Sequence, residues 1–413
     1  MPQADLQNPR HLSLRTATLL AFLSSCSFFS GVANARVKPG AEVWISQHFG
    51  KLRGKKIGLI TNQTGVLPDL RHEADVLAAS KDIQLVALFA PEHGFRGAAQ
   101  AGQSEGPAID PATSLPVFDT YGKSGAALVE LFRRSGAEAF VFDIQDVGAR
   151  YYTFIWTLYD AMEAAAALGR PFVVLDRPNP IGGALVQGPL LHPEVASFVG
   201  RKPIAVRHGM TIGELARFYK AQFVKVELEV VPMSGWSRAM RFEDTGLPWV
   251  PPSPNMPTVD TAQVFCGTAL FEGTNLSEGR GTTRPFEIVG APGLDRRYAA
   301  ALESLHLPGV RFRETWFRPT FEKWRDQTIG GVELHVTDRK TFDPVRTAVA
   351  MLIVAKRLDS GFAWRKDWID KMWGSDRLRT MIDEGKSEAD ITASYRDELA
   401  QFIALRRTVL LYK

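Results

Sequence analysis

Cysteine is scarce in this sequence, with only Cys26 and Cys266 among 413 residues. Cys26 lies in an N-terminal segment that has the pattern of a secretory signal, so the mature chain would keep Cys266 alone. A single cysteine excludes an internal disulfide and a cysteine-rich metal site. The neighbours of Cys266 in AQVFCGTALF are apolar, and we therefore expect a buried structural thiol.

Long apolar runs and a strong excess of charge are also missing. No segment approaches the roughly 18 uninterrupted apolar residues of a membrane-spanning helix. The formal net charge is +4 and falls to +3 when Arg10, Arg15 and Asp5 are removed with the first 35 residues. No cluster of lysine or arginine stands out along the chain. The sequence therefore predicts no transmembrane span and no nucleic-acid partner.

The first 35 residues have the order of a secretory signal. Two arginines precede an apolar run, and small residues follow it up to Ala35. This pattern predicts cleavage after Ala35 and an exported mature protein. The stretch LSSC, which ends at Cys26, resembles a bacterial lipobox and provides the alternative of a lipoprotein attached to a membrane through Cys26.

From residue 55 onward, short β-rich runs alternate with helical patterns, as in parallel βαβ units. Right-handed crossovers between such strands place helices on both faces of the sheet. The sequence therefore predicts an α/β fold with a Rossmann-like, doubly wound, mostly parallel sheet. The expected strands are 55–61, 83–90, 139–144, 171–176 and 226–233, and the expected helices lie near 72–80, 124–134, 151–168 and 212–222, the last with a capping box at Thr211 and Glu214.

The second half of the chain has a different composition. Residues 247–258 contain five prolines, which predict a stiff loop. Residues 271–293 are rich in glycine, threonine and charge, and predict a long loop. From about residue 291, helical patterns surround a single strand-like run, GVELHVTD. We therefore predict a signal peptide over 1–35, a Rossmann-like catalytic domain over 36–290 and a smaller α+β domain over 291–413.

Each of the first four expected strands ends in a polar cluster. In open α/β sheets, ligands bind outside the carboxyl ends of the strands, so these clusters are predicted to converge on one cleft. Structural roles are the alternatives: an Asx turn for Asn62, helix caps for the two aspartates, or an ion pair between Asp143 and Arg150. The candidates are Asn62, Gln63, Glu92, His93, Asp143, Gln145, Asp146, Arg150, Tyr152, Asp176, Arg177 and Asn179.

Glu92, in LFAPEHGFRG, directly follows an apolar strand. Partial burial at the mouth of the sheet would favour its protonated form, which a general acid near neutral pH requires. The sequence has no His-Glu-x-x-His pair, no Gly-x-Ser-x-Gly elbow, no Gly-x-Gly-x-x-Gly after the first strand and no Walker loop. These gaps argue against a metal site, a serine nucleophile and a nucleotide cofactor.

The long loop adds Glu272, Asn275, Glu278 and Arg280 to the candidates. Solvated charges in a mobile linker are the structural alternative. The functional interpretation is a loop that closes the cleft between the domains. Its amide, guanidinium and carboxylate groups suit a hydroxyl-rich, partly anionic ligand.

Seven sequence blocks, read in order, resemble the NamZ-type exo-β-N-acetylmuramidases, glycoside hydrolase family 171. The blocks are GLITNQTG, FAPEHGFRG, FDIQDVGARYYTFIWTLYDAMEAA, VLDRPNPIGG, RHGMTIGELA, PPSPNMPT and FEGTNLSEGRGTTRPFEIVGAP. All of them lie before residue 293, and a general helix-rich similarity follows. The resemblance implies a Rossmann-like N-terminal domain and a smaller C-terminal domain.

The resemblance also implies a periplasmic enzyme of cell-wall turnover. Such an enzyme releases N-acetylmuramic acid from the non-reducing end of peptidoglycan chains by cutting the β-1,4 bond to N-acetylglucosamine, and the proposed catalytic acid of the family falls on Glu92. Our hypotheses for the second catalytic group are Asp143 and Asp146. For the lactyl carboxylate of the sugar, they are Arg150, Arg177 and Arg280. A muropeptide-binding protein without turnover and a cell-wall esterase or amidase are the alternative functions.

Overall fold

The structure is a computed structural model that describes residues 36–413, which form one compact unit. The predicted signal peptide and the alternative lipid anchor at Cys26 lie outside the described residues. Among the helices of residues 36–413, none combines the length and the apolar character that crossing a membrane requires.

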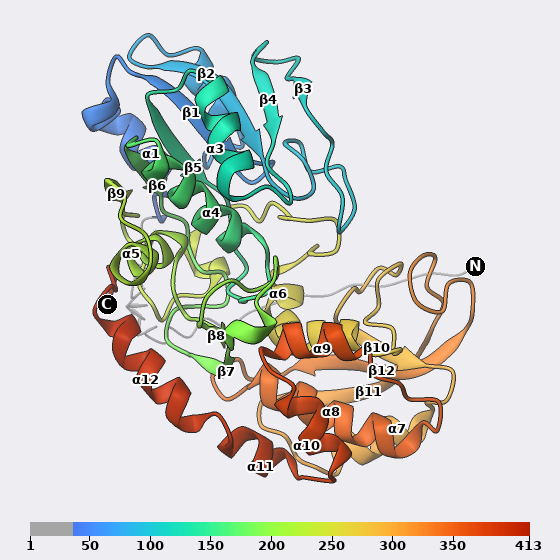
Figure 1. The fold of residues 1–413 in the computed structure, drawn as a ribbon. Helices are drawn as coiled ribbons and strands as arrows, with labels where there is room; N and C mark the ends of the chain where they lie inside the picture. The colour runs from blue at the N-terminus through green and yellow to red at the C-terminus, as the bar shows by residue number, and fades with distance from the viewer. Residues whose placement is uncertain (1–35) are drawn as a thin grey trace, which may run out of the picture. The chain divides into compact units, whose positions relative to one another are not determined.

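A seven-stranded sheet in the order β3-β4-β2-β1-β5-β6-β9 forms the N-terminal part (Figure 1). Its neighbouring strands are parallel, except for the antiparallel pair β3 and β4 at one edge. All five expected strands are confirmed, whereas β3 and β4 were not predicted because they are short and partly exposed. The strands are β1 (Lys56–Thr61), β2 (Gln84–Ala90), β3 (Ala108–Ile109), β4 (Pro116–Asp119), β5 (Ala139–Asp143), β6 (Phe172–Leu175) and β9 (Leu228–Val231).

Helices cover both faces of this sheet, as expected. Successive side chains of a strand point to opposite faces. Accordingly, Leu59 and Val141 pack with α1 and α2, whereas Ile60 and Phe142 pack with α3, α4 and α5. The doubly wound arrangement is therefore confirmed, and so is the capping box of α5. The helices are α1 (Gly40–Ser46), α2 (Glu73–Ala78), α3 (Gly125–Arg134), α4 (Phe154–Ala167) and α5 (Ile212–Gln222), with the 3-10 helices η1 (Gly50–Leu52), η2 (Pro193–Val195) and η3 (Phe242–Thr245).

The C-terminal part contains a three-stranded antiparallel sheet in the order β10-β12-β11. The sequence predicted one strand here, and that prediction was incomplete. The two edge strands were missed because β10 is short and because β11 alternates charged, exposed residues with a few buried ones. The strands are β10 (Ile288–Ala291), β11 (Val310–Phe317) and β12 (Ile329–Val336), and a separate antiparallel pair joins β7 (Gln187–Leu190) and β8 (Ala205–Arg207).

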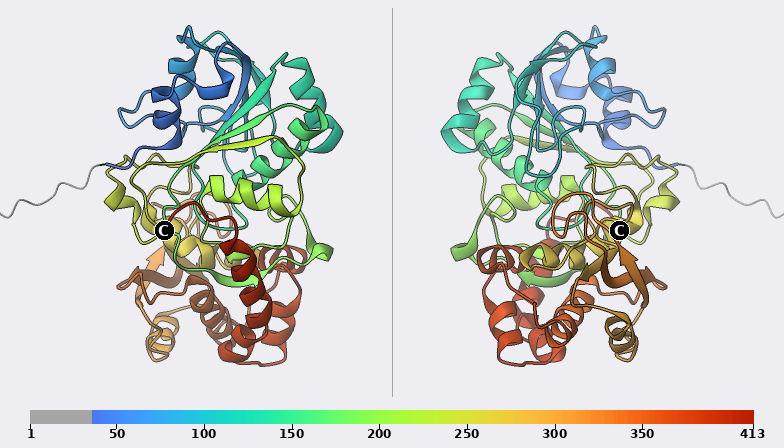
Figure 2. Two further views of the ribbon diagram at one scale, coloured as in Figure 1. Left: turned by 90° about the vertical axis from the view of Figure 1, so that its left-hand side faces the viewer. Right: turned by 90° about the vertical axis from the view of Figure 1, so that its right-hand side faces the viewer.

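Seven helices and one 3-10 helix complete the described chain. The helix α12 runs from α11 back toward α5, and the terminal residues then contact the central sheet region (Figure 1; Figure 2). There the Tyr412 hydroxyl donates to the Asp176 carboxylate, and the backbone amide of Leu411 donates to Glu214. The elements are α6 (Val259–Thr268), η4 (Ala269–Gly273), α7 (Arg296–Glu303), α8 (Pro344–Leu358), α9 (Lys366–Trp373), α10 (Arg377–Asp383), α11 (Glu388–Ala393) and α12 (Arg396–Arg407).

One hydrophobic core extends from helices α3, α4 and α5 through α6 to α8. The thiol of Cys266 lies inside it, as expected, and burial raises the pKa of that thiol to about 12. The proline-rich stretch 247–258 contains neither helix nor strand, as expected. Because the core is continuous, the contacts do not divide residues 36–413 into two units, and the boundary at residue 290 stays a prediction.

Candidate functional site

The candidate site is a cavity of about 270 Å³ between the central sheet and the C-terminal part. The loops that follow β2 and β5 form one wall, and the proline-rich stretch contributes Ser253 and Asn255. The opposite wall comes from the long loop 271–293, the segment that holds Glu322 and Lys323, and helix α9. Residues far apart in the sequence therefore meet around one space.

Glu92 lies at this cavity in a tightly held position. Strand β2 is buried along most of its length, and the chain turns sharply after it, with His93 at φ 73° and Gly94 at φ 85°. The Glu92 side chain is buried, with 8% of the residue exposed. Its Oε1 accepts a hydrogen bond from the backbone amide of Gly102 at 2.7 Å, and its Oε2 accepts one from the Thr153 hydroxyl at 2.6 Å.

His93 also lines the cavity, but its hydrogen bonds shape the loop. Its Nδ1 lies 2.9 Å from the carbonyl oxygen of Ala99, and its backbone amide donates to the carbonyl of Gln103 at 3.0 Å. A left-handed conformation is unusual for a residue with a side chain and persists only where surrounding contacts enforce it. These contacts close the loop that carries Gly102, the donor to Glu92.

Tyr152 contributes an unpartnered hydroxyl at the start of α4. It lines the cavity, and its buried hydroxyl has no hydrogen-bond partner among the described residues. Burial raises the pKa of Tyr152 far above its ordinary value, although the nearby Ser253 side chain opposes that rise, so the hydroxyl stays neutral. A buried polar group without a partner is costly, and a ligand hydroxyl or carbonyl would satisfy it.

The long loop brings three of its four predicted residues to the cavity. The Arg280 guanidinium lies 3.0 Å from Glu272 and 3.3 Å from Glu278, and Lys323 lies 2.9 Å from Glu278. The carboxylates of this wall are therefore largely paired. Asn275 does not line the cavity, because its side-chain amide bonds to the backbone of residues 361 and 363 and holds the loop in place.

The other predicted residues lie outside the cavity. Asp143 is fully buried and forms a two-point ion pair with Arg177, next to Glu73. Burial, reinforced by the charge of Asp143, raises the pKa of Glu73 well above its ordinary value. Arg177 and Gln145 line a cavity of only about 20 Å³.

Arg150 is also fully buried. Its guanidinium donates to the carbonyl oxygens of Pro189 at 2.8 Å, Ile204 at 3.2 Å, Met372 at 2.7 Å and Trp373 at 2.8 Å. These bonds connect the β7–β8 region to α9. The Arg150 side chain therefore stabilises the packing of these segments, and it lines neither the 270 Å³ cavity nor the 20 Å³ cavity.

The remaining polar candidates bond mainly to the backbone of nearby loops. Asn62 accepts from the amide and hydroxyl of Thr64, which is the Asx turn considered as its alternative role. Asp146 accepts from the amide of Gly148 at 2.8 Å and lies 3.2 Å from His208. Gln63 donates to the carbonyl of Pro251, and Asn179 donates to that of Met210.

The position of the cavity has a physical reason. The strand order reverses between β1 and β5, where ligands usually bind in such folds. In this protein, the loop around Val66 and the stretch 247–250 pack over that point and leave only the 20 Å³ cavity. The 270 Å³ cavity lies beside these packed segments, next to the C-terminal end of β2 and the N-terminal end of α4. The C-terminal part supplies its second wall.

Several cavity residues were not found from the sequence. Ser253 and Asn255 belong to a stretch that was recognised as a loop, and their polar side chains were the available signal. Tertiary packing brings the others to the site without a motif; they are Thr153, Phe198, Glu322, Lys323, Arg365 and Trp368.

Comparison with known proteins covers almost the whole chain. Two family models match, described as the N-terminal and C-terminal parts of the exo-β-N-acetylmuramidase NamZ, over residues 57–260 and 263–412. The peptidoglycan β-N-acetylmuramidase NamZ of Bacillus subtilis is 45% identical over 96% of this chain and 99% of its own length.

Solved structures show the same fold. A DUF1343 family protein from Bacteroides fragilis has a TM-score of 0.84 at 33% identity and covers 92% of this chain and 99% of its own. A second protein of that family from the same organism has a TM-score of 0.70 at 29% identity, with 91% and 99% covered. The expected family is confirmed: this chain belongs to the exo-β-N-acetylmuramidase NamZ family.

Proposed function

We propose that this protein is an exo-acting glycoside hydrolase that releases N-acetylmuramic acid from the non-reducing end of peptidoglycan glycan chains. The bond cut is the β-1,4 linkage to N-acetylglucosamine. Support comes from the family membership over residues 57–260 and 263–412 and from the cavity that holds Glu92. A cavity of about 270 Å³ lined by carboxylates, cations and aromatic rings suits the terminal unit of a sugar chain.

The observation that carries this proposal is the position of the Glu92 carboxyl group. Two hydrogen bonds, from Gly102 and Thr153, hold it at the cavity wall. In its protonated form, Glu92 donates a proton to the glycosidic oxygen while the sugar gains oxocarbenium character. Orientation of the proton donor before the reaction lowers the barrier, because no rearrangement is required in the transition state.

A second group must activate water or attack the anomeric carbon. Asp143 and Asp146 do not line the cavity, so we assign this role to a cavity carboxylate instead. Glu272 and Glu278 are paired with Arg280. Glu322 also lines the cavity and forms no ion pair within residues 36–413, so its carboxylate is available to accept a proton. We therefore assign the role of the second group to Glu322.

The lactyl carboxylate of N-acetylmuramic acid requires a cation. Arg280 is already engaged by two glutamates, and neither Arg150 nor Arg177 lines the cavity. Arg365 lines it and donates to the backbone carbonyl of Glu272 at 3.1 Å, with no carboxylate partner in the described chain. Its remaining guanidinium donors match a planar carboxylate, and we assign the lactyl group to Arg365.

The proposed location is the periplasm, with a soluble protein released by cleavage after Ala35. This proposal rests on the N-terminal sequence pattern. Mass spectrometry of the mature N-terminus tests it. A chain that begins at Arg36 supports export as a free protein, and a lipid-modified Cys26 replaces that proposal with a membrane-anchored form.

The decisive experiment compares the wild-type protein with Glu92→Gln on the disaccharide N-acetylmuramyl-β-1,4-N-acetylglucosamine. Loss of general-acid assistance is expected to lower kcat by about 10² to 10⁴-fold, with folding and ligand affinity retained. Turnover of β-N-acetylmuramyl fluoride is expected to fall much less, because fluoride leaves with little help from an acid. Glu227→Gln, at an exposed position outside the cavity, serves as the matched control.

The products separate the alternative functions. Free N-acetylmuramic acid identifies glycosidase action. A wild-type protein that binds the disaccharide without releasing sugar would be a binding protein. Release of acetate from the disaccharide, or of a peptide from a muropeptide substrate, without cleavage of the glycosidic bond would identify an esterase or amidase. Wild-type turnover by Glu92→Gln would overturn the assignment of Glu92.

A further inference from the structure

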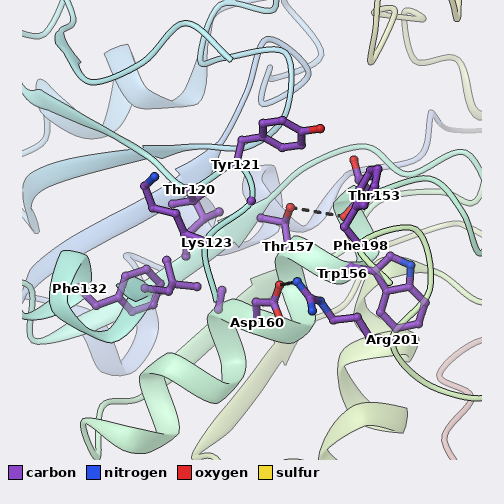
Figure 3. A pocket seen from close by; sticks show the side chains of 14 residues that line it. Thr120, Tyr121, Lys123, Phe132, Thr153, Trp156, Thr157, Asp160, Phe198 and Arg201 are labelled. Carbon is purple, nitrogen blue, oxygen red and sulfur yellow. Dashed lines mark hydrogen bonds and ion pairs between the residues drawn. The ribbon is translucent and has the colours of Figure 1, made fainter. Parts of the chain in front are cut away.

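A second, smaller cavity adjoins the one that holds Glu92. Its volume is about 30 Å³, and it shares two lining residues, Thr153 and Phe198, with the larger cavity (Figure 3). Thr153 is the residue whose hydroxyl donates to Glu92. The proposed proton donor therefore lies where the two cavities meet.

The small cavity combines an apolar floor with a polar rim. Leu128 and Phe132 of α3 contribute to the floor. On the rim, Arg201 forms an ion pair with Asp160 at 2.7 Å (Figure 3). Tyr121 also lines this cavity, and burial together with the nearby charge of Glu92 raises the pKa of its hydroxyl to about 12.

Phe198 is the unusual residue at this junction. It lies between η2 and β8 and is 41% exposed although it is a large apolar side chain. Its ring centroid is 5.8 Å from that of Trp368, which lines the larger cavity from α9 and donates to Glu272 at 3.3 Å. The ring of Phe198 lines both cavities beside Trp368, and the C–H face of a pyranose ring is an apolar surface that fits such a ring.

A glycosidic oxygen has one sugar on each side. If Glu92 protonates that oxygen, the terminal muramic acid occupies the larger cavity, where Arg365 lies. Thr153 and Phe198 line both cavities, so a leaving sugar next to Glu92 can extend over these two residues toward the small cavity. Phe198 and the small cavity are the surfaces that border Thr153 on that side.

We propose that Phe198 is the stacking platform for the leaving-group sugar, N-acetylglucosamine, and that the small cavity receives a substituent of that sugar. This inference rests on the proposed function. It places the leaving-group sugar at Phe198 and the small cavity. Phe198 would then determine specificity for a sugar over a small leaving group.

The test uses two substrates that share the muramic acid unit and differ in the leaving group. These are N-acetylmuramyl-β-1,4-N-acetylglucosamine and β-N-acetylmuramyl fluoride. The expected result for Phe198→Ala is a fall of about tenfold or more in the ratio of kcat/KM for the disaccharide to kcat/KM for the fluoride, because only the disaccharide carries a leaving sugar that can stack on Phe198. Any contact between Phe198 and the muramic acid unit is common to both substrates and cancels in the ratio. Phe198→Trp is expected to restore most of this ratio.

Phe223→Ala is the matched control. Phe223 is 37% exposed and lines neither cavity, so its loss is expected to leave the ratio unchanged. An unchanged ratio in Phe198→Ala, or an equal loss with both substrates, would overturn the inference while the proposed function stands. A wild-type protein that releases no N-acetylmuramic acid from either substrate would instead refute the proposed function.

Discussion

The hydroxyl of Thr153, at the N-terminus of α4, donates a hydrogen bond of 2.6 Å to the carboxyl group of Glu92, at the end of β2. This bond connects two segments that are 61 residues apart in the sequence and orients the proposed proton donor. The backbone amide of Gly102 holds the other oxygen at 2.7 Å.

We expect Thr153→Val to lower kcat on the disaccharide by up to roughly tenfold. Glu92 acts in its neutral, protonated form, and a hydrogen bond between neutral groups contributes about 0.5 to 1.5 kcal/mol, while every 1.4 kcal/mol corresponds to about a factor of ten in rate. Thr153→Ser keeps the hydroxyl and is expected to retain most of the activity. Steady-state kinetics of both variants checks this, and equal activities of the valine and serine variants would contradict a role for the bond.

Arg150→Met is expected to destabilise the fold by at least about 3 kcal/mol, because buried carbonyl oxygens that lose their donor cost about 1 to 3 kcal/mol each. Burial already lowers the pKa of Arg150 to about 10, and four carbonyls compensate for that burial. Urea-induced unfolding measures the loss. The exposed Arg357→Met is the control, with a change within about 0.5 kcal/mol. A stable Arg150→Met protein with impaired substrate binding would instead support the original binding role.

Asp176 predicts a pH dependence of stability. Burial raises its pKa to about 7, although hydrogen bonds from Tyr412, Gly213 and Thr211 oppose that rise. The folded chain therefore binds more protons than the unfolded chain between about pH 4 and pH 7, and the contribution of this group to stability falls as the pH rises through that range.

Tyr412→Phe removes a donor to the charged form of Asp176. The loss of stability is therefore expected to be larger at about pH 8, where the carboxylate is charged, than at about pH 5, where it is protonated, with a magnitude of about 1 to 3 kcal/mol at the higher pH. Urea unfolding at the two pH values measures it. Tyr298→Phe is the matched control, because the Tyr298 hydroxyl donates to the carbonyl of Met351, which does not titrate. Equal losses at both pH values in Tyr412→Phe would contradict the prediction.

Arg365→Met is expected to lower the preference for muramic acid substrates. The ratio of kcat/KM for a chromogenic N-acetylmuramic acid glycoside to that for the matching N-acetylglucosaminide should fall by about tenfold or more, because only the former carries the lactyl carboxylate. Arg365→Lys is expected to recover part of the ratio through its charge. Arg325→Met, at an exposed position outside the cavity, is the control. An unchanged ratio would show that a cation other than Arg365 binds the lactyl carboxylate.

Local signals in the sequence predicted most of the central sheet. The strands that follow Lys55 are apolar and bounded by turn residues, and the capping box at Thr211 marks the start of α5. The edge strand β11 was missed because its residues alternate between charged and apolar, as expected where a sheet edge faces solvent. The seven sequence blocks likewise predicted the family, and the two family models confirm it.

The sequence by itself determined the fold class and the family, and it singled out Glu92 as a candidate, because strand ends and turn residues leave local patterns in the chain. Only the tertiary structure decided which polar residues share a cavity. Asp143 and Arg177 neutralise each other below the strand ends, since buried charges require partners. Thr153, Phe198 and Arg365 meet Glu92 through packing between distant segments, and such packing follows from how all the elements fit together.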